Sequence, residues 1–143
     1  MHRASGGCHC GNLLVDLELS RAPDTYNPRA CDCDFCRKHC ASYLSDPQGS
    51  MGIRIKDERH WGRYQQGSGT AEFMVCTRCG VLIGVLYRGD GRVHGAVNTK
   101  AIDGATSFGT EQPVSPKTLP SSEKVKRWQS VWFSDVRIVT GEA

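Results

Sequence analysis

The alternation of hydrophobic and polar residues is clearest near the N-terminus, at residues 13–19. Apolar side chains occupy every second position there, which is the pattern of a half-buried strand; they are Leu13, Val15, Leu17 and Leu19. A continuous apolar run at 81–87 is typical of a buried strand, and Gly84 within it indicates a bulge or the close approach of another backbone. The turn residues at 88–92 then predict that 93–97 pairs back as a hairpin.

The remaining predicted elements are short. Further strands are expected at 42–44, 53–55, 61–65 and 72–75. Helix is scarce, with a short helix predicted at 34–40, where Asp32 or Asp34 would be the N-cap, another near 99–103, and a final helical turn at 121–128. The pattern therefore predicts a mainly β protein with short helices.

The organisation along the chain is that of one domain, since 143 residues is the usual size of a single domain. We expect its core at about 6–103, followed by an irregular C-terminal extension at 104–143. Proline, serine and threonine are frequent at 110–120, which favours irregular surface structure in that extension.

Composition indicates the compartment and the partners. Hydrophobic residues make up 38% of the chain, so the core is modest and bound metal would help to hold it together. No apolar run approaches the roughly 20 residues that cross a membrane, and residues 1–7 lack the apolar stretch of a secretory signal. We therefore expect a cytoplasmic protein that binds no membrane. Its thiols would stay reduced, so metal or redox use of the cysteines is favoured over disulfides.

The formal charge of +3 treats the cysteines as neutral. Seven thiolates holding two Zn²⁺ ions would bring that charge to about zero, because metal-bound cysteines are deprotonated. The sequence thus gives little support for a basic surface that binds nucleic acid. It contains no signal for the oligomeric state.

Seven of the eight cysteines form three clusters, and two of these clusters make a four-thiolate site. The pairs Cys8–Cys10 and Cys76–Cys79 are each followed by a glycine, and Gly80 lets the backbone leave its turn with a positive φ. Four thiolates are the usual ligand set of a closed, structural zinc site. The alternative is that these cysteines are buried and bind no metal.

The third cluster provides three thiolates within six residues, from Cys31, Cys33 and Cys36. Three protein ligands leave one position of a tetrahedral zinc open, which is typical of a catalytic site. If Cys36 begins the short helix, the helix dipole would favour its thiolate. Two alternatives remain: Cys40 closes the site as a fourth ligand, or Cys33 and Cys36 form a redox pair.

Three segments together resemble one family. They are 5–11 (SGGCHCG), 31–38 (CDCDFCRK) and 73–80 (FMVCTRCG), and 97–103 (VNTKAID) adds to the likeness. In order and spacing they are similar to the glutathione-dependent formaldehyde-activating enzyme (Gfa) family, which also includes centromere protein V. The resemblance implies a small zinc-stabilised β-tent of stacked antiparallel sheets.

The resemblance also implies two zinc ions with different roles. Cys8, Cys10, Cys76 and Cys79 would hold a structural zinc, and Cys31, Cys33 and Cys36 a catalytic one. The implied activity is that of a carbon–sulfur lyase, which activates glutathione for reversible addition to formaldehyde or a related aldehyde and forms an S-hydroxymethyl thiol adduct. The alternative is a non-catalytic interaction module in which both zinc sites are structural.

Residues beside the third cluster have two interpretations each. Arg37 and Lys38 either attract the carboxylates of glutathione or form an exposed helix face. His39 either shuttles a proton or lies at the surface. Asn98 either orients a ligand or caps the turn that follows it.

Overall fold

Two β-sheets form the body of the protein. The computed structural model describes residues 1–66, 69–89, 91–104 and 107–141. The four-stranded sheet has the order β1-β2-β5-β11; its strands are β1 (His2–Gly7), β2 (Leu13–Leu19), β5 (Ser50–Ile55) and β11 (Asp135–Thr140). The seven-stranded sheet has the order β10-β3-β4-β9-β8-β7-β6; its strands are β3 (Arg29–Cys31), β4 (Tyr43–Leu44), β6 (Trp61–Tyr64), β7 (Ala71–Cys76), β8 (Leu82–Gly89), β9 (Arg92–Asn98) and β10 (Gln112–Val114).

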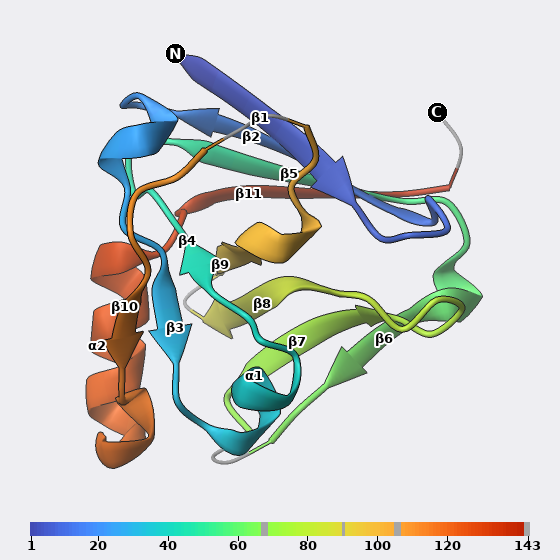
Figure 1. The fold of residues 1–143 in the computed structure, drawn as a ribbon. Coiled ribbons are helices and arrows are strands. Elements are labelled where there is room, and N and C mark those ends of the chain that lie inside the picture. The colour runs from blue at the N-terminus through green and yellow to red at the C-terminus, as the bar shows by residue number, and fades with distance from the viewer. Residues whose placement is uncertain (67–68, 90, 105–106, 142–143) are drawn as a thin grey trace.

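Helices are short, as predicted, and the two α-helices lie beside the seven-stranded sheet (Figure 1). The α-helices are α1 (Asp34–Lys38) and α2 (Ser121–Val131), and the 3-10 helices are η1 (Pro23–Thr25), η2 (Glu58–His60), η3 (Thr99–Ala101) and η4 (Pro116–Thr118). Figure 1 shows α2 next to β10 and β3. Among the described residues, no helix combines the length and the apolar character needed to cross a membrane.

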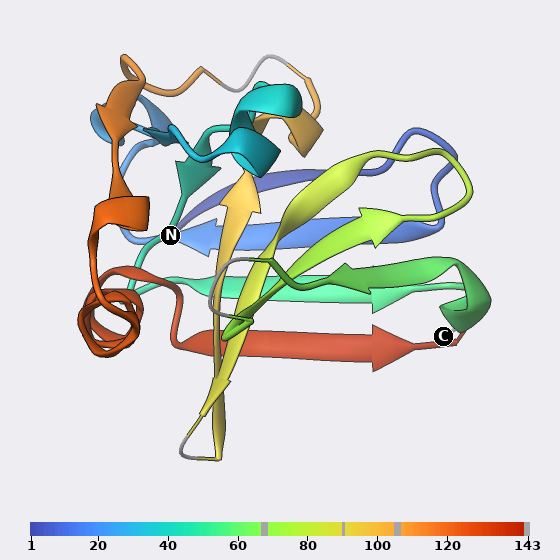
Figure 2. The ribbon, with the colours of Figure 1, turned by 90° about the horizontal axis from the view of Figure 1, so that it is seen from below.

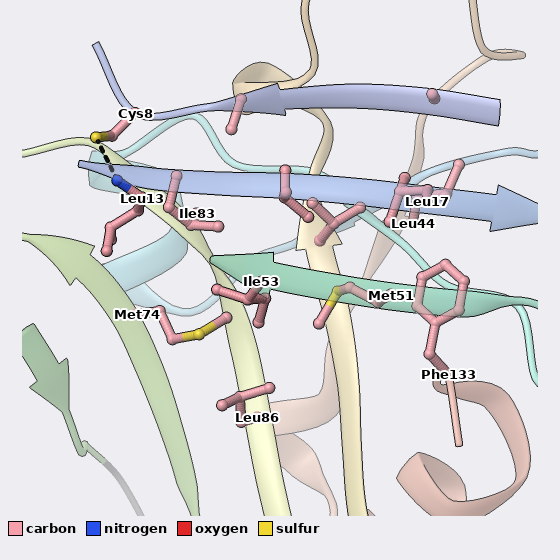
Figure 3. Packing of buried hydrophobic residues seen from close by; sticks show 14 of the residues in the cluster. Cys8, Leu13, Leu17, Leu44, Met51, Ile53, Met74, Ile83, Leu86 and Phe133 are labelled. Atoms are coloured by element: carbon pink, nitrogen blue, oxygen red, sulfur yellow. Dashed lines mark hydrogen bonds between the residues drawn. The ribbon is translucent and has the colours of Figure 1, made fainter. Parts of the chain in front are cut away.

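The core lies between the two sheets. The predicted alternation in β2 is confirmed, because its four apolar side chains at odd positions are all buried. Figure 3 shows Leu13, Leu17 and Met51 of the four-stranded sheet packing toward side chains of the other sheet, among them Met74 and Leu86. Strands β8 and β9 cross the four-stranded sheet steeply (Figure 2), so one hydrophobic layer is shared by strands of different direction.

The hairpin predicted after the apolar run is confirmed, with β8 and β9 pairing antiparallel; position 90 of its turn lies outside the described residues. Gly84 fulfils both expectations. The β7–β8 register shifts beside it, which is a bulge, and a Cβ at this position would collide with the carbonyl oxygen of Ala96.

The sheets are mainly antiparallel, but two edge pairs are parallel: β10 with β3, and β11 with β5. The irregular extension predicted for 104–143 is wrong for its described part, which contains β10, α2 and β11. These elements are ordered by tertiary contacts: Trp128 and Trp132 bury their rings, and β11 completes the four-stranded sheet with Val136 and Ile138 packed against the core. The period-two pattern of β11 was a signal that could have predicted it.

Candidate metal centres and cavity

The two cysteine pairs meet as one four-thiol group. The sulfur atoms of Cys8, Cys10, Cys76 and Cys79 all lie within 4.8 Å of one another. The Cys8–Cys10 and Cys10–Cys76 sulfur distances are 3.7 and 3.6 Å. Four sulfurs bonded tetrahedrally to Zn²⁺ at about 2.3 Å would lie about 3.8 Å apart, so this donor set fits the ion. The group joins the end of β1 to the β7–β8 connection, and thereby one sheet to the other.

Local backbone geometry brings each pair together. Gly80 has a φ of +82°, as predicted, and its N–H donates to the carbonyl oxygen of Cys76 at 2.7 Å. Gly11 has a φ of +83° and donates in the same way to Cys8 at 3.2 Å. The N–H of Leu13 donates to the Cys8 sulfur at 3.2 Å (Figure 3). These tight turns point sulfur atoms inward, and the hydrogen bond favours a thiolate.

Two thiols of this group, Cys76 and Cys79, differ in acidity. Burial raises the pKa of Cys76. Burial also acts on Cys79, but hydrogen bonds from the backbone of Cys10 and Val81 outweigh it and lower the pKa of Cys79. One thiol of the pair therefore ionises readily while its buried neighbour keeps the proton, unless a cation at the centre displaces it.

A second group contains the sulfur atoms of Cys31, Cys33 and Cys36, which also lie within 4.8 Å of one another. They come from the end of β3, the residue before α1, and α1 itself. The N-cap of α1 is Cys33, whose sulfur accepts the N–H of Cys36 at 3.4 Å, so the predicted caps Asp32 and Asp34 are wrong.

Cys31 and Cys36 differ in how readily their thiols lose a proton. A hydrogen bond with Cys36 lowers the pKa of Cys31 to about 6. The same hydrogen bond, together with burial, raises the pKa of Cys36. The helix start alone therefore does not set the acidity of Cys36, because its sulfur is hydrogen-bonded to Cys31 and buried. The Cys36 sulfur also contacts the hydroxyl of Tyr43 at 3.1 Å.

Cys40 does not belong to this group; it is exposed and lies just after α1. Cys40 has a φ of +51°, and its N–H donates to the carbonyl oxygen of Arg37 at 3.1 Å. The N–H of Ala41 donates to the carbonyl oxygen of Cys36 at 3.0 Å. This is the hydrogen-bond pattern of a Schellman motif, in which the left-handed residue turns the chain away from the helix. Among the described residues, no other cysteine, histidine or carboxylate joins the three thiols.

A cavity of about 260 Å³ opens beside the three thiols. Its apolar wall includes Phe73, Val85, Trp128 and Trp132. Basic side chains also line it: Arg29, Lys117, Lys124 and Arg127. A metal with one open position among the three sulfurs would therefore face a half-apolar, positively charged space.

The basic residues in the cavity are not those that the sequence suggested. Arg37 and Lys38 are exposed on α1 and do not line the cavity. The ring of His39 packs against that of Phe35, with the two ring centroids 4.8 Å apart. A signal for Arg29 was present, since residues two apart in a strand share a face and Arg29 precedes Cys31 by two. Asn98 caps η3, with its side-chain oxygen accepting the N–H of Lys100 at 3.2 Å.

The fold and these groups define a small β protein with two sets of cysteines that could hold metal ions. A model of the family described as "Glutathione-dependent formaldehyde-activating enzyme" matches residues 3–117, and the chain belongs to this family. The predicted resemblance is thereby confirmed. No curated protein matches the chain. It is similar to the crystal structure of a Rhodobacter sphaeroides protein, with 26% identity and a TM-score of 0.53, covering 71% of this chain and 89% of that one.

Proposed function

We propose that this protein is a zinc-dependent enzyme of the carbon–sulfur lyase type, which activates a thiol for reversible addition to an aldehyde. By family, the thiol is glutathione and the aldehyde is formaldehyde or a relative. The observation that carries the proposal is the set of three converging thiols at a cavity, with no fourth protein ligand among the described residues. Structural zinc sites are closed by four protein ligands, whereas catalytic sites keep one position for the substrate.

The two thiol groups would hold two zinc ions with different roles. Cys8, Cys10, Cys76 and Cys79 would hold a structural zinc that ties the two sheets together. Cys31, Cys33 and Cys36 would hold the catalytic zinc. When bound there, Zn²⁺ supplies a Lewis acid that favours the deprotonated form of a thiol at neutral pH.

The protein's own residues prepare the site in two ways. Once Cys36 is a thiolate, the hydroxyl of Tyr43 must be the donor in their contact, because a thiolate has no proton to give. Burial, followed by the charge of Cys36, raises the pKa of Tyr43, so this hydroxyl stays protonated at neutral pH. The apolar wall around Phe73 and Trp128 lowers the local polarity, which strengthens electrostatic interactions beside it.

The proposed reaction conserves its atoms without an oxidant or reductant. The thiol gives up its proton, its sulfur bonds to the carbonyl carbon, and the carbonyl oxygen gains a proton to become a hydroxyl. Breaking the same carbon–sulfur bond reverses the reaction, which places the activity in the lyase class. The cavity would hold the two reactants side by side and thus replace a bimolecular encounter. Reduced thiols also make the cytoplasm the proposed location.

The test combines metal content with rate. Elemental analysis of gently purified protein should give two zinc ions per chain, and addition of glutathione should perturb or release one of them. Because the thiol and aldehyde also combine spontaneously, exchange between free formaldehyde and the adduct should be followed by NMR at equilibrium, with and without protein. Acceleration over the uncatalysed exchange is expected.

Matched cysteine variants locate the activity. Cys31→Ser should retain one zinc and lose the acceleration, whereas Cys40→Ser should keep both zinc ions and full activity, because Cys40 lies outside the group. One zinc in the unmodified protein, or two that ignore glutathione with no acceleration, would reject the enzyme and favour the non-catalytic interaction module. A loss of the second zinc in Cys40→Ser would show that this site is closed.

A further inference from the structure

The cavity beside the three thiols carries an excess of positive charge. Among the described residues, Arg29, Lys124 and Arg127 form no ion pair with a carboxylate. Lys117 lies 3.8 Å from Asp32, so its charge is partly balanced. Cations that line a partly closed cavity without acidic partners are unfavourable to the extent that burial removes them from water. Such a cluster is stabilised when an anion enters.

Arg29 is the clearest member of this cluster. Its Nη2 donates to the Ser45 hydroxyl at 2.6 Å, and that hydroxyl donates to the carbonyl oxygen of Val131 at 2.8 Å. These partners orient the guanidinium but leave its charge unbalanced. An arginine side chain keeps its proton in proteins, so Arg29 is a cation at neutral pH, and Arg127 lines the same cavity. Two neighbouring guanidinium groups repel each other unless a carboxylate or a similar anion lies between them.

Helix α2 brings the other two cations to the cavity. Lys124, Arg127 and Trp128 are spaced i, i+3 and i+4, so they lie on one face of the helix. The Trp128 ring is buried, with its centroid 5.5 Å from that of Tyr87 and 4.9 Å from that of Trp132. These rings fix the helix on the seven-stranded sheet with its basic side chains at the cavity. The helix lies C-terminal to the segment 3–117 that matches the family model.

We propose that Arg29, Lys124 and Arg127 form a carboxylate-binding subsite, and that α2 thereby makes the cavity selective for thiols that carry a carboxylate. The inference that the ligand carries a thiol rests on the proposed function. The inference that it carries a carboxylate rests on the cationic cluster alone. Arg29 and Cys31 are two residues apart in β3, which spans about 6.6 Å. Because Arg29 and Cys31 line the same cavity, one ligand can reach the three thiols with its sulfur and the cationic cluster with a carboxylate.

The cluster has one other use, which is to balance the thiolates of the metal site. Three thiolates and one Zn²⁺ carry a net charge of about −1, and a bound substrate thiolate would add a further negative charge. If that were its purpose, the cluster would support any thiol, whether or not the ligand carries a carboxylate. Two ligands distinguish these uses: one in which the thiol is blocked, and one in which the carboxylates are blocked.

The test uses three probes on the zinc-loaded protein: glutathione, glutathione diethyl ester, in which the carboxylates are blocked, and S-methylglutathione, in which the thiol is blocked. Dissociation constants are measured by calorimetry. Arg127→Gln and Lys124→Gln are the test variants, and Lys126→Gln on the exposed side of the same helix is the matched control. Thermal melts report whether each variant is folded, and the two test variants provide independent readings.

We expect wild type to bind S-methylglutathione, and each test variant to bind both glutathione and S-methylglutathione at least about tenfold more weakly, the loss typical of a hydrogen bond to a charged group. Binding of the diethyl ester should not weaken in either variant, and Lys126→Gln should behave as wild type. The subsite is overturned if wild type does not bind S-methylglutathione, if the ester binds as tightly as glutathione, or if both folded variants bind all three probes normally.

The outcomes also separate this inference from the proposed function. Binding of S-methylglutathione that depends on Arg127, in a protein whose zinc ignores glutathione, would support the subsite and reject thiol activation. Perturbation of the zinc by glutathione and by its ester alike, with no effect of the helix variants, would support thiol activation and reject the subsite.

Discussion

Asp46 is a buried acidic side chain that lies at the junction between the two sheets. Its Oδ2 accepts hydrogen bonds from the N–H of Ser20 at 2.8 Å, the hydroxyl of Ser20 at 2.7 Å and the hydroxyl of Tyr26 at 2.5 Å. Its Oδ1 accepts the N–H of Gln48 at 2.9 Å. Ser20 follows β2 of one sheet and Asp46 follows β4 of the other, so the buried carboxylate joins them. Burial raises the pKa of Asp46, but these hydrogen bonds outweigh it and hold the pKa below its ordinary value.

Asp46→Asn tests this account because it changes one oxygen to an amide that donates hydrogen bonds. Whichever way the amide turns, it faces at least one backbone N–H that needs an acceptor, and the charge is lost. A hydrogen bond to a charged group contributes about 1.5–3 kcal/mol, and an unsatisfied buried donor costs a similar amount. With some relaxation, we expect the free energy of unfolding to fall by about 2–4 kcal/mol at neutral pH.

The pH dependence provides a second test of Asp46. A carboxyl whose folded-state pKa is lowered contributes stability above its unfolded pKa, near 4, and this contribution is lost as pH falls through the folded-state value. The difference between wild type and Asp46→Asn should therefore shrink below about pH 4. Zinc loss in acid affects both proteins alike, so the difference remains informative.

The assay is urea unfolding followed by tryptophan fluorescence and circular dichroism, at neutral pH and in acid. Asp16→Asn is the matched control, since it makes the same chemical change at an exposed position on β2. It should alter stability by no more than about 0.5 kcal/mol. A cost below about 1 kcal/mol for Asp46→Asn at neutral pH, or a difference that stays constant into acid, would refute the reasoning.

Two further predictions concern the β8–β9 hairpin and the metal sites. Gly84→Ala should destabilise the protein by at least about 2 kcal/mol in urea unfolding, because the added methyl group meets the carbonyl of Ala96. Gly52→Ala is the control and should be close to neutral, since the nearest atom to its added methyl group is 3.9 Å away. Equal effects of the two substitutions would contradict the packing of this hairpin. Chelation should remove the three-thiolate zinc first, with little change in circular dichroism, and the four-thiolate zinc later, with a fall in the thermal midpoint, because only the latter links the two sheets. Loss of both ions in one step, measured by elemental analysis, would contradict the two roles.

Much of the fold was predictable because its signals are local. The alternation at 13–19 and the apolar run at 81–87 both became strands of the core. Strand β1 was missed, because its sequence HRASGG has almost no apolar pattern and the strand is held mainly by backbone pairing with β2. Strand β11 was missed although its pattern was visible, since its parallel pairing with β5 joins segments about 80 residues apart.

The sequence by itself determined the local chemistry of both thiol groups. Each pair of the four-thiol group is followed by a glycine with a positive φ, and this tight turn brings the two sulfurs of the pair together locally, although only the fold brings the two pairs to each other. Only the tertiary structure decided which side chains surround them. Cys40 is four residues from Cys36 yet turns away, whereas Lys124 and Arg127 are some 90 residues from Cys31 and Cys36 yet line the same cavity. Their positions depend on how the tryptophans of α2 pack against the sheet, and such long-range packing leaves no mark in the spacing of the residues.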